Sequence, residues 1–254
     1  SVEYVERGSY DQERVIDIQA AVRAARGVDY IILCLGENSY CETPGNLKEM
    51  AISENQQALA KALAATGKPI ILVLNEGRNR IIRSFVDEMD AVLHTYLPGT
   101  EGGRALASII YGDVNPSGKL PLTFYADDSQ LVDYESYDMK GRTYRYFDKP
   151  LFHFGHGLSY TTFKFGKGKV IASADGKQEF VVKVKNTGKR DGENVVQLYV
   201  SRPDDAQGPI KTLRGYKRVS LKAGESAEVR IPVDEETFLW WNPASGRMNP
   251  LAGE

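Results

Sequence analysis

The chain has 254 residues, more than one hydrophobic core usually covers, so its length predicts two domains. Apolar residues make up 42% and charged residues 26% of the sequence, which excludes a disordered or membrane-embedded chain. The formal net charge is −2 with lysine and arginine scattered along the chain, so we expect no basic stripe and exclude nucleic acid and membrane surfaces as partners. The expected ligand is a neutral small molecule or polymer.

The first part of the chain alternates helices with short apolar strands. Asp11 is a candidate helix cap, and apolar residues then recur on one helical face as far as Gly27. Residues 28–35 form a short, β-branched apolar run of the kind found in parallel strands covered on both faces, so we expect a central strand there. The pattern repeats with a helix capped by Ser53 and a second buried strand over residues 70–74.

A third, weaker cycle follows. It consists of a short helix over residues 81–89, a strand over 91–94 and a helix over 101–111. Alternating strands and helices with short turns predict a parallel sheet wound by right-handed crossovers. We therefore expect an α/β domain over residues 1–125.

The rest of the chain has a different rhythm. Residues 126–163 lack periodicity and carry many aromatic rings, which indicates an ordered connector rather than a flexible linker. These rings include Tyr134, Tyr137, Tyr144, Tyr146 and Phe147. From residue 164 to 254 apolar residues alternate with polar ones, and short strands recur about every ten residues. This pattern predicts an all-β sandwich of the immunoglobulin or fibronectin kind.

The richest candidate site is the acidic loop, residues 36–47, which follows the first predicted strand. Ligands of open α/β sheets bind beyond the carboxyl ends of the strands. The loop holds the carboxylates of Glu37 and Glu42, an aromatic ring and amide groups. A glutamate there could act as a general acid if a neighbour raised its pKa, although loop carboxylates are more often only solvated.

The loop after the second strand carries Arg78 and Arg80, which could bind substrate or hold the acidic loop in place by charge-assisted hydrogen bonds. We favour the structural role. The three histidines, at positions 94, 153 and 156, lack partners at metal-ligand spacing, so we expect no metal site and expect His94 to be a packed core group. No glycine-rich phosphate motif follows any strand, so we expect no nucleotide cofactor.

Five segments of the chain carry long motifs, which read GENSYCETPGNL, LNEGR, LPGTEGGRALASIIYGDVNPSGKLPLTF, YRYFDKPLFHFGHGLSYTTF and VKNTGKRDGENVVQLYV. Together these segments resemble the C-terminal half of family 3 glycoside hydrolases of the β-glucosidase type. The resemblance covers nearly all of the chain. It implies an α/β sandwich domain followed by a fibronectin type III-like domain.

The resemblance also implies a retaining β-glycosidase that hydrolyses terminal β-linked sugars in oligosaccharides or aryl β-glycosides. Glucose is the sugar that we favour. An N-terminal barrel of the full-length protein would supply the nucleophilic aspartate. By position in the motif, Glu42 matches the acid/base residue, whereas Glu37 is a supporting residue and the second choice. Tyr40 and Asn46 would border the sugar site. This chain has no barrel, so we expect it to be inactive alone.

The resemblance leaves other points open. The family pattern continues into a final strand where this sequence stops at Glu254, so we expect the sandwich to lack its last strand and to have an unpaired edge. The surface that would meet the barrel could serve homo-oligomer formation. We favour a periplasmic or secreted location over the cytoplasm. A non-catalytic carbohydrate-binding or scaffolding module is the alternative function.

Overall fold

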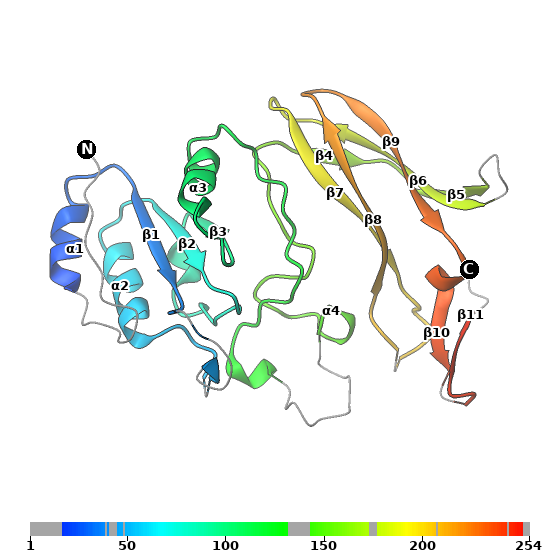
Figure 1. The fold of residues 1–254 in the computed structure, drawn as a ribbon, viewed down its shortest axis with the longest axis horizontal. Coiled ribbons are helices and arrows are strands. Elements are labelled where there is room, and N and C mark those ends of the chain that lie inside the picture. Colours follow the sequence, from blue (N-terminus) through cyan, green and yellow to red (C-terminus); the bar gives the residue numbers. More distant parts are fainter. Residues whose placement is uncertain are drawn as a thin grey trace. The chain divides into compact units, whose positions relative to one another are not determined.

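The computed structural model divides the chain into two compact units (Figure 1). The first comprises residues 1–107 and 124–132, and the second comprises residues 108–123 and 133–254. The structure describes residues 17–38, 40, 45–47, 49–131, 143–172, 177–206, 208–242 and 244–250. Residues 108–123 thus group with the second unit, although the sequence analysis assigns them to the first domain. The domain boundaries expected from the sequence remain a prediction.

The first unit contains a three-stranded parallel sheet in the order β1 (Ile31–Gly36), β2 (Ile70–Asn75) and β3 (Ala91–His94). This arrangement confirms the predicted α/β fold. However, the expectation that the first strand is central is wrong for the described part of the chain, where β2 lies in the middle. Ile32 of β1 is 49% exposed, whereas Leu72 of β2 is fully buried. A β-branched apolar run does not distinguish an edge strand from a central one.

Helices α1 (Ile18–Ala25) and α2 (Glu54–Ala64) begin at capping side chains and pack against each other (Figure 1). The cap of α1 is Asp17, whose carboxylate accepts from the Ala20 N–H at 2.8 Å, and the predicted cap Asp11 lies outside the described residues. The predicted cap of α2, Ser53, is confirmed. None of the described helices is long and apolar enough to cross a membrane.

Of the two helices predicted later in this region, one is present and the other is not. The helix predicted over residues 101–111 is present as α3 (Gly102–Ile110). The helix predicted over 81–89 is wrong, because only the 3-10 segment η2 (Val86–Glu88) forms there. Ile82, Phe85 and Val86 are all buried, so residues outside any α-helix that pack into the core reproduce the spacing of a helical face.

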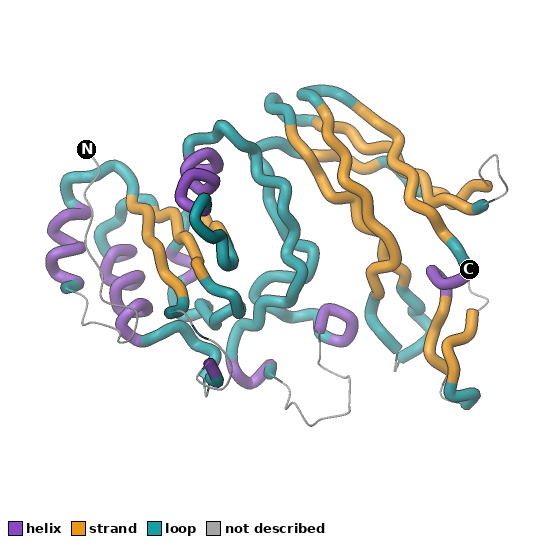
Figure 2. The backbone as a smooth tube through the Cα atoms, in the orientation of Figure 1, coloured by secondary structure: helices purple, strands orange, loops and turns teal. Residues whose placement is uncertain are grey.

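The segment between α3 and β4 (Phe163–Phe165) is mostly loop, with the short helices η3 (Asp128–Gln130) and α4 (Thr143–Tyr146) (Figure 2). Two of its predicted aromatic residues, Tyr134 and Tyr137, lie outside the described residues. Within the second unit, the Tyr144 ring stacks on Phe154 with centroids 4.1 Å apart, and its hydroxyl accepts from the Leu213 N–H at 3.0 Å. These contacts join Tyr144 to other residues of the second unit, and the ordered connector expected over residues 126–163 remains a prediction.

The second unit is an antiparallel β structure, as predicted. One sheet pairs β6 (Gln178–Asn186) with β4, β5 (Lys169–Ala172) and β9 (Ser226–Val233). The other pairs β7 (Gly192–Val200) with β8 (Thr212–Leu221). A hairpin is formed by β10 (Leu239–Asn242) and β11 (Arg247–Pro250). Alternate residues of these strands fill a core, including Val182, Val184, Val196, Leu221, Val229 and Ile231. Residues 251–254 lie outside the described part, so the lack of a last strand remains a prediction.

The close pairing of β1 and β2 generates a prediction at Gly36. A Cβ atom there would lie 2.0 Å from the carbonyl oxygen of Asn75, a backbone atom that cannot move aside. We expect Gly36→Ala to destabilise the first unit by about 1–3 kcal/mol in urea unfolding. The control is Gly103→Ala in α3, where a Cβ meets no atom within 4 Å. This control should instead stabilise by roughly 0.5–1 kcal/mol, and equal effects of the two changes would contradict the packing argument.

Candidate active site

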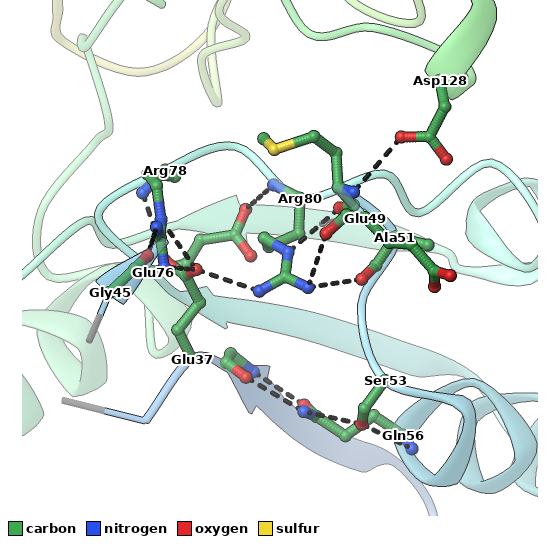
Figure 3. Close-up of polar contacts among 12 residues, drawn as sticks. Glu37, Gly45, Glu49, Ala51, Ser53, Gln56, Glu76, Arg78, Arg80 and Asp128 are labelled. Carbon is green, nitrogen blue, oxygen red and sulfur yellow. Dashed lines mark hydrogen bonds and ion pairs between the residues drawn. The ribbon is translucent and has the colours of Figure 1, made fainter. Parts of the chain in front are cut away.

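The acidic loop and the loop after β2 meet at the carboxyl edge of the parallel sheet. Figure 3 shows the Glu37 side chain between Arg78 and Arg80. Arg78 donates to Glu37 Oε1 from Nε at 3.0 Å and from Nη2 at 2.8 Å, and its backbone N–H donates to Oε2 at 3.3 Å. Arg80 Nη1 donates to the same Oε1 at 3.0 Å. With its side chain only 4% exposed, Glu37 is a nearly buried carboxylate with two cationic partners.

Arg80 joins the start of the acidic loop to the backbone just beyond its end. Besides Glu37, its guanidinium binds the carbonyl oxygens of Met50, from Nε at 3.0 Å, and of Ala51, from Nη2 at 2.5 Å (Figure 3). Glu37 follows β1, whereas Met50 and Ala51 lie between the end of the acidic loop and α2, which begins at Glu54. One side chain therefore links the start of the loop to the backbone just beyond its end.

Arg78 holds the interior of the same loop. Its Nη1 donates to the Gly45 carbonyl oxygen, and its guanidinium carbon lies 3.7 Å from the centroid of the Tyr40 ring. A cation over the face of a tyrosine is attracted by the ring quadrupole. The structural role that we favoured for Arg78 and Arg80 is therefore confirmed by these contacts.

Gln56 of α2 fixes the end of β1. Its side-chain oxygen accepts from the Gly36 N–H at 2.9 Å, and its side-chain nitrogen donates to the Gly36 carbonyl at 3.0 Å (Figure 3). The same nitrogen donates to Ser53 Oγ at 3.2 Å, which links this contact to the helix cap. The residue before Glu37 is thus held on both backbone groups. The sequence analysis did not identify Gln56, and no motif distinguished it from other polar helix residues.

The environment of Glu37 determines its charge state. Burial alone would raise the pKa of its carboxyl, but hydrogen bonds from Arg78 and Arg80 outweigh burial and hold this pKa below its ordinary value. Glu37 is therefore ionised at neutral pH. A carboxylate held in this state is a poor proton donor.

A buried carboxylate, that of Glu76, binds the backbone of the loop after β2, which carries Arg78 and Arg80. Glu76 is fully buried, and its Oε1 accepts from the Arg80 N–H at 3.1 Å and lies 3.4 Å from His94 Nε2. His94 packs edge-on against Tyr96 and Phe124, with centroids 4.1 and 5.3 Å away. This packing confirms the prediction that His94 is a core group. The sequence analysis missed Glu76, although a carboxylate directly after a buried strand is an available signal.

Some buried polar atoms around Glu76 lack hydrogen-bond partners among the described residues. Glu76 Oε2, both ring nitrogens of His94 and the Tyr96 hydroxyl have no hydrogen-bond partner among the described residues. Tyr96 also has a φ of 53°, in the left-handed region that residues with side chains seldom adopt. Unpaired buried polar atoms and backbone strain both reduce stability, and they often accompany functional sites.

The structure describes the positions of three predicted site residues but not that of the fourth. Glu37 and Tyr40 are brought together around Arg78, and Tyr40 remains 38% exposed. Asn46 is also exposed. Glu42, the predicted acid/base residue, lies outside the described residues. Within the described part of the chain, no group of three His, Cys, Asp or Glu side chains could hold a metal ion.

Comparisons with known proteins match both units. Residues 8–160 match the model of the glycosyl hydrolase family 3 C-terminal domain, and residues 194–254 match that of the fibronectin type III-like domain. A xylan 1,4-beta-xylosidase of Xylanibacter ruminicola is 39% identical over 96% of this chain and 30% of its own length. A periplasmic beta-glucosidase of Salmonella typhimurium is 38% identical over 89% of this chain and 32% of its own length.

Solved structures give the same relationship. The crystal structure of DesR, a beta-glucosidase from Streptomyces venezuelae in complex with D-glucose, matches with a TM-score of 0.80 and 34% identity. The match covers 92% of this chain and 32% of that protein. The chain therefore spans about a third of the length of these relatives.

The ion cluster makes a prediction at Glu37. Glu37→Gln keeps the side-chain shape but leaves two guanidinium groups without their carboxylate, so we expect a loss on the order of 3 kcal/mol in urea unfolding at pH 7. The matched control is Glu54→Gln, an exposed glutamate of α2, which should change stability by less than about 0.5 kcal/mol.

The same variant should alter the pH dependence of stability. Because the folded-state pKa of Glu37 is lowered, its contribution is complete above the ordinary glutamate value of 4.5 and is lost as the pH falls through the folded-state pKa. Unfolding measured between pH 7 and pH 3 should therefore show a smaller acid loss for Glu37→Gln than for the parent. Parallel curves would contradict the assignment of Glu37 as an ionised partner.

Proposed function

Since the chain belongs to glycosyl hydrolase family 3 and carries its C-terminal domain, we propose that it is the acid/base half of a retaining β-glycosidase. The substrates would be oligosaccharides or aryl β-glycosides with a terminal β-linked sugar, glucose in the first place. Relatives named as a beta-glucosidase and a beta-xylosidase support this substrate class. The proposal extends to a periplasmic or secreted location, since the Salmonella relative is named as periplasmic.

The acid/base residue in this proposal is Glu42. The observation that carries it is the pairing of Glu37, the other carboxylate of the predicted site, with Arg78 and Arg80. That pairing lowers the pKa of Glu37 and occupies both of its oxygens, so Glu37 is poorly suited to donate a proton. Glu42 is the remaining carboxylate of the acidic loop.

The proposed reaction needs two carboxyl groups about 5–5.5 Å apart. The nucleophile would be an aspartate of an N-terminal barrel in the full-length protein, which attacks the anomeric carbon. Glu42 protonates the glycosidic oxygen as the leaving group departs, and the resulting carboxylate then takes a proton from the water that hydrolyses the glycosyl-enzyme. Without the barrel, the chain would be inactive.

The contacts of Arg78 and Arg80 support the proposed role of the acidic loop in presenting Glu42. Arg80 holds Glu37 at the start of the acidic loop and Met50 just beyond its end, and Arg78 holds Gly45, three residues after Glu42. A loop held at both ends and within its length loses less entropy when it closes on a substrate. We assign Arg78 and Arg80 as positioning residues, and we place Tyr40 and Asn46 at the border of the sugar site.

The acid/base assignment predicts a dependence on the leaving group. In the full-length protein, Glu42→Gln should reduce kcat/KM by about 10²- to 10⁴-fold on β-glucosides with poor leaving groups. It should have a much smaller effect on those with good leaving groups, because these depart without protonation. Rates on a series of aryl β-glucosides test this, together with the 254-residue chain alone, which should show no activity.

The control for this series is Glu54→Gln in the same full-length protein, because Glu54 is an exposed carboxylate outside the acidic loop. Its rates should match those of the parent. If Glu42→Gln retained parental activity on poor leaving groups, Glu42 would not be the general acid. Glycosidase activity of the chain alone would instead support a complete site within it.

A second prediction concerns Tyr40. If this ring borders the sugar site, Tyr40→Ala in the full-length protein should raise KM for an aryl β-glucoside by about five- to tenfold. Tyr40→Phe keeps the ring over Arg78 and should retain most of the affinity. Thermal unfolding of both variants separates loss of binding from loss of folding. Unchanged KM in Tyr40→Ala would exclude this residue from the site.

A further inference from the structure

The outer face of the sheet formed by β4, β5, β6 and β9 gathers lysine side chains. Val182 and Val184 of β6 point into the core, so the residues between and beside them point outward. These are Lys183 and Lys185, both exposed.

Neighbouring strands add cations to the same face. The antiparallel register places Lys164 of β4 opposite Lys185, and it places Lys169 of β5 and Arg230 of β9 on either side of Val181. Residues directly opposite each other in adjacent strands project from the same side of the sheet. The expectation that the chain has no basic stripe is therefore wrong for this face. Strand pairing brings together lysines that are dispersed in the sequence.

Few carboxylates offset this charge. Of the two on this face, Glu228 lies opposite Lys183 in the register, but it binds Arg230 at 2.5 Å. The other, Glu179, binds Arg230 at 3.0 Å. The described residues form no ion pair with Lys164, Lys169, Lys183 or Lys185. The cationic face, defined by these four lysines, is therefore positive in a chain whose net charge is −2.

This arrangement is unfavourable for the isolated fold. Like charges directly opposite in a sheet are destabilising, and Lys164 and Lys185 form such a pair. Lysines on edge strands protect a sheet from pairing with other chains, which accounts for those on β4 and β5. It does not account for Lys183 and Lys185, because β6 lies in the middle of its sheet. Their concentration indicates an interaction surface.

We propose that the cationic face binds an acidic polysaccharide through the carboxylates of its uronic acid residues. Lysines two apart on a strand are about 6.6 Å apart, and opposite residues are about 5 Å apart. Such a ladder of point charges suits a polymer that repeats a carboxylate along its length. The family acts on glycosides, so an enzyme held on a charged glycan would be placed near glycosidic bonds.

The side chains of the cationic face are less suited to nucleic acid than to an acidic polysaccharide. Its outward residues on the four described strands include no aromatic ring on which a base could stack. Its only arginine, Arg230, is already bound by Glu179 and Glu228. The proposal uses no residue of the acidic loop, so it does not depend on the role of Glu42.

The test measures binding of the 254-residue chain to polygalacturonate at 50 mM and 200 mM salt, with fully methyl-esterified polygalacturonate as the neutral polymer. The parent should bind the acidic polymer and not the ester, and it should bind more weakly at the higher salt. Lys183→Gln combined with Lys185→Gln should weaken binding by about tenfold. The charge-matched control combines Lys217→Gln with Lys222→Gln, two exposed lysines of β8 and its following turn, and should bind like the parent.

Three results would overturn the proposal. One is no binding to polygalacturonate at 50 mM salt, and another is an equal loss in the two double variants. The third is tighter binding to duplex DNA or to phosphatidylserine vesicles than to polygalacturonate, which would assign the face to a different partner. Circular dichroism of both variants confirms that each is folded, so a loss of binding reports the surface itself.

Discussion

The position of the acidic loop depends on one ion cluster, in which Glu37 is shared by Arg78 and Arg80. Each guanidinium also makes further contacts. Arg80 binds the carbonyl oxygens of Met50 and Ala51, just beyond the loop, and Arg78 binds that of Gly45. A buried carboxylate is stable only if its charge is compensated, so Glu37 keeps both arginines in place. The positions of the described loop residues and the charge state of Glu37 therefore have the same physical cause.

The sheet supplies the geometry that this cluster requires. Parallel pairing of β1 with β2 brings Gly36 opposite Asn75, so the loops after the two strands leave the same edge. Glu76 then fixes the backbone of Arg80 from a fully buried position, at the expense of an unpaired oxygen.

Local signals in the sequence predicted the parts of the fold that local physics decides. Ser53 caps α2 as its side chain requires, and the apolar run of residues 70–74 forms a buried strand. Features that depend on distant residues were not predictable in this way. Ile82, Phe85 and Val86 imitate a helical face, and the edge position of β1 depends on which strands pair. The sequence favoured Arg78 and Arg80 as residues that hold the acidic loop, but it did not identify which carboxylate binds them, because Arg78 is 41 residues away from Glu37 along the chain.

Arg80 bonds to Glu37 at the start of the acidic loop and to the backbone just beyond its end, and these contacts determine which changes the loop can accept. Closing a flexible loop costs entropy that rises only slowly with length, by about 0.6 kcal/mol for each doubling. Because the two ends are joined by one guanidinium, insertions or deletions between them leave the distance that must be closed unchanged. The segment could therefore vary in length and composition without rebuilding the sheet that carries it.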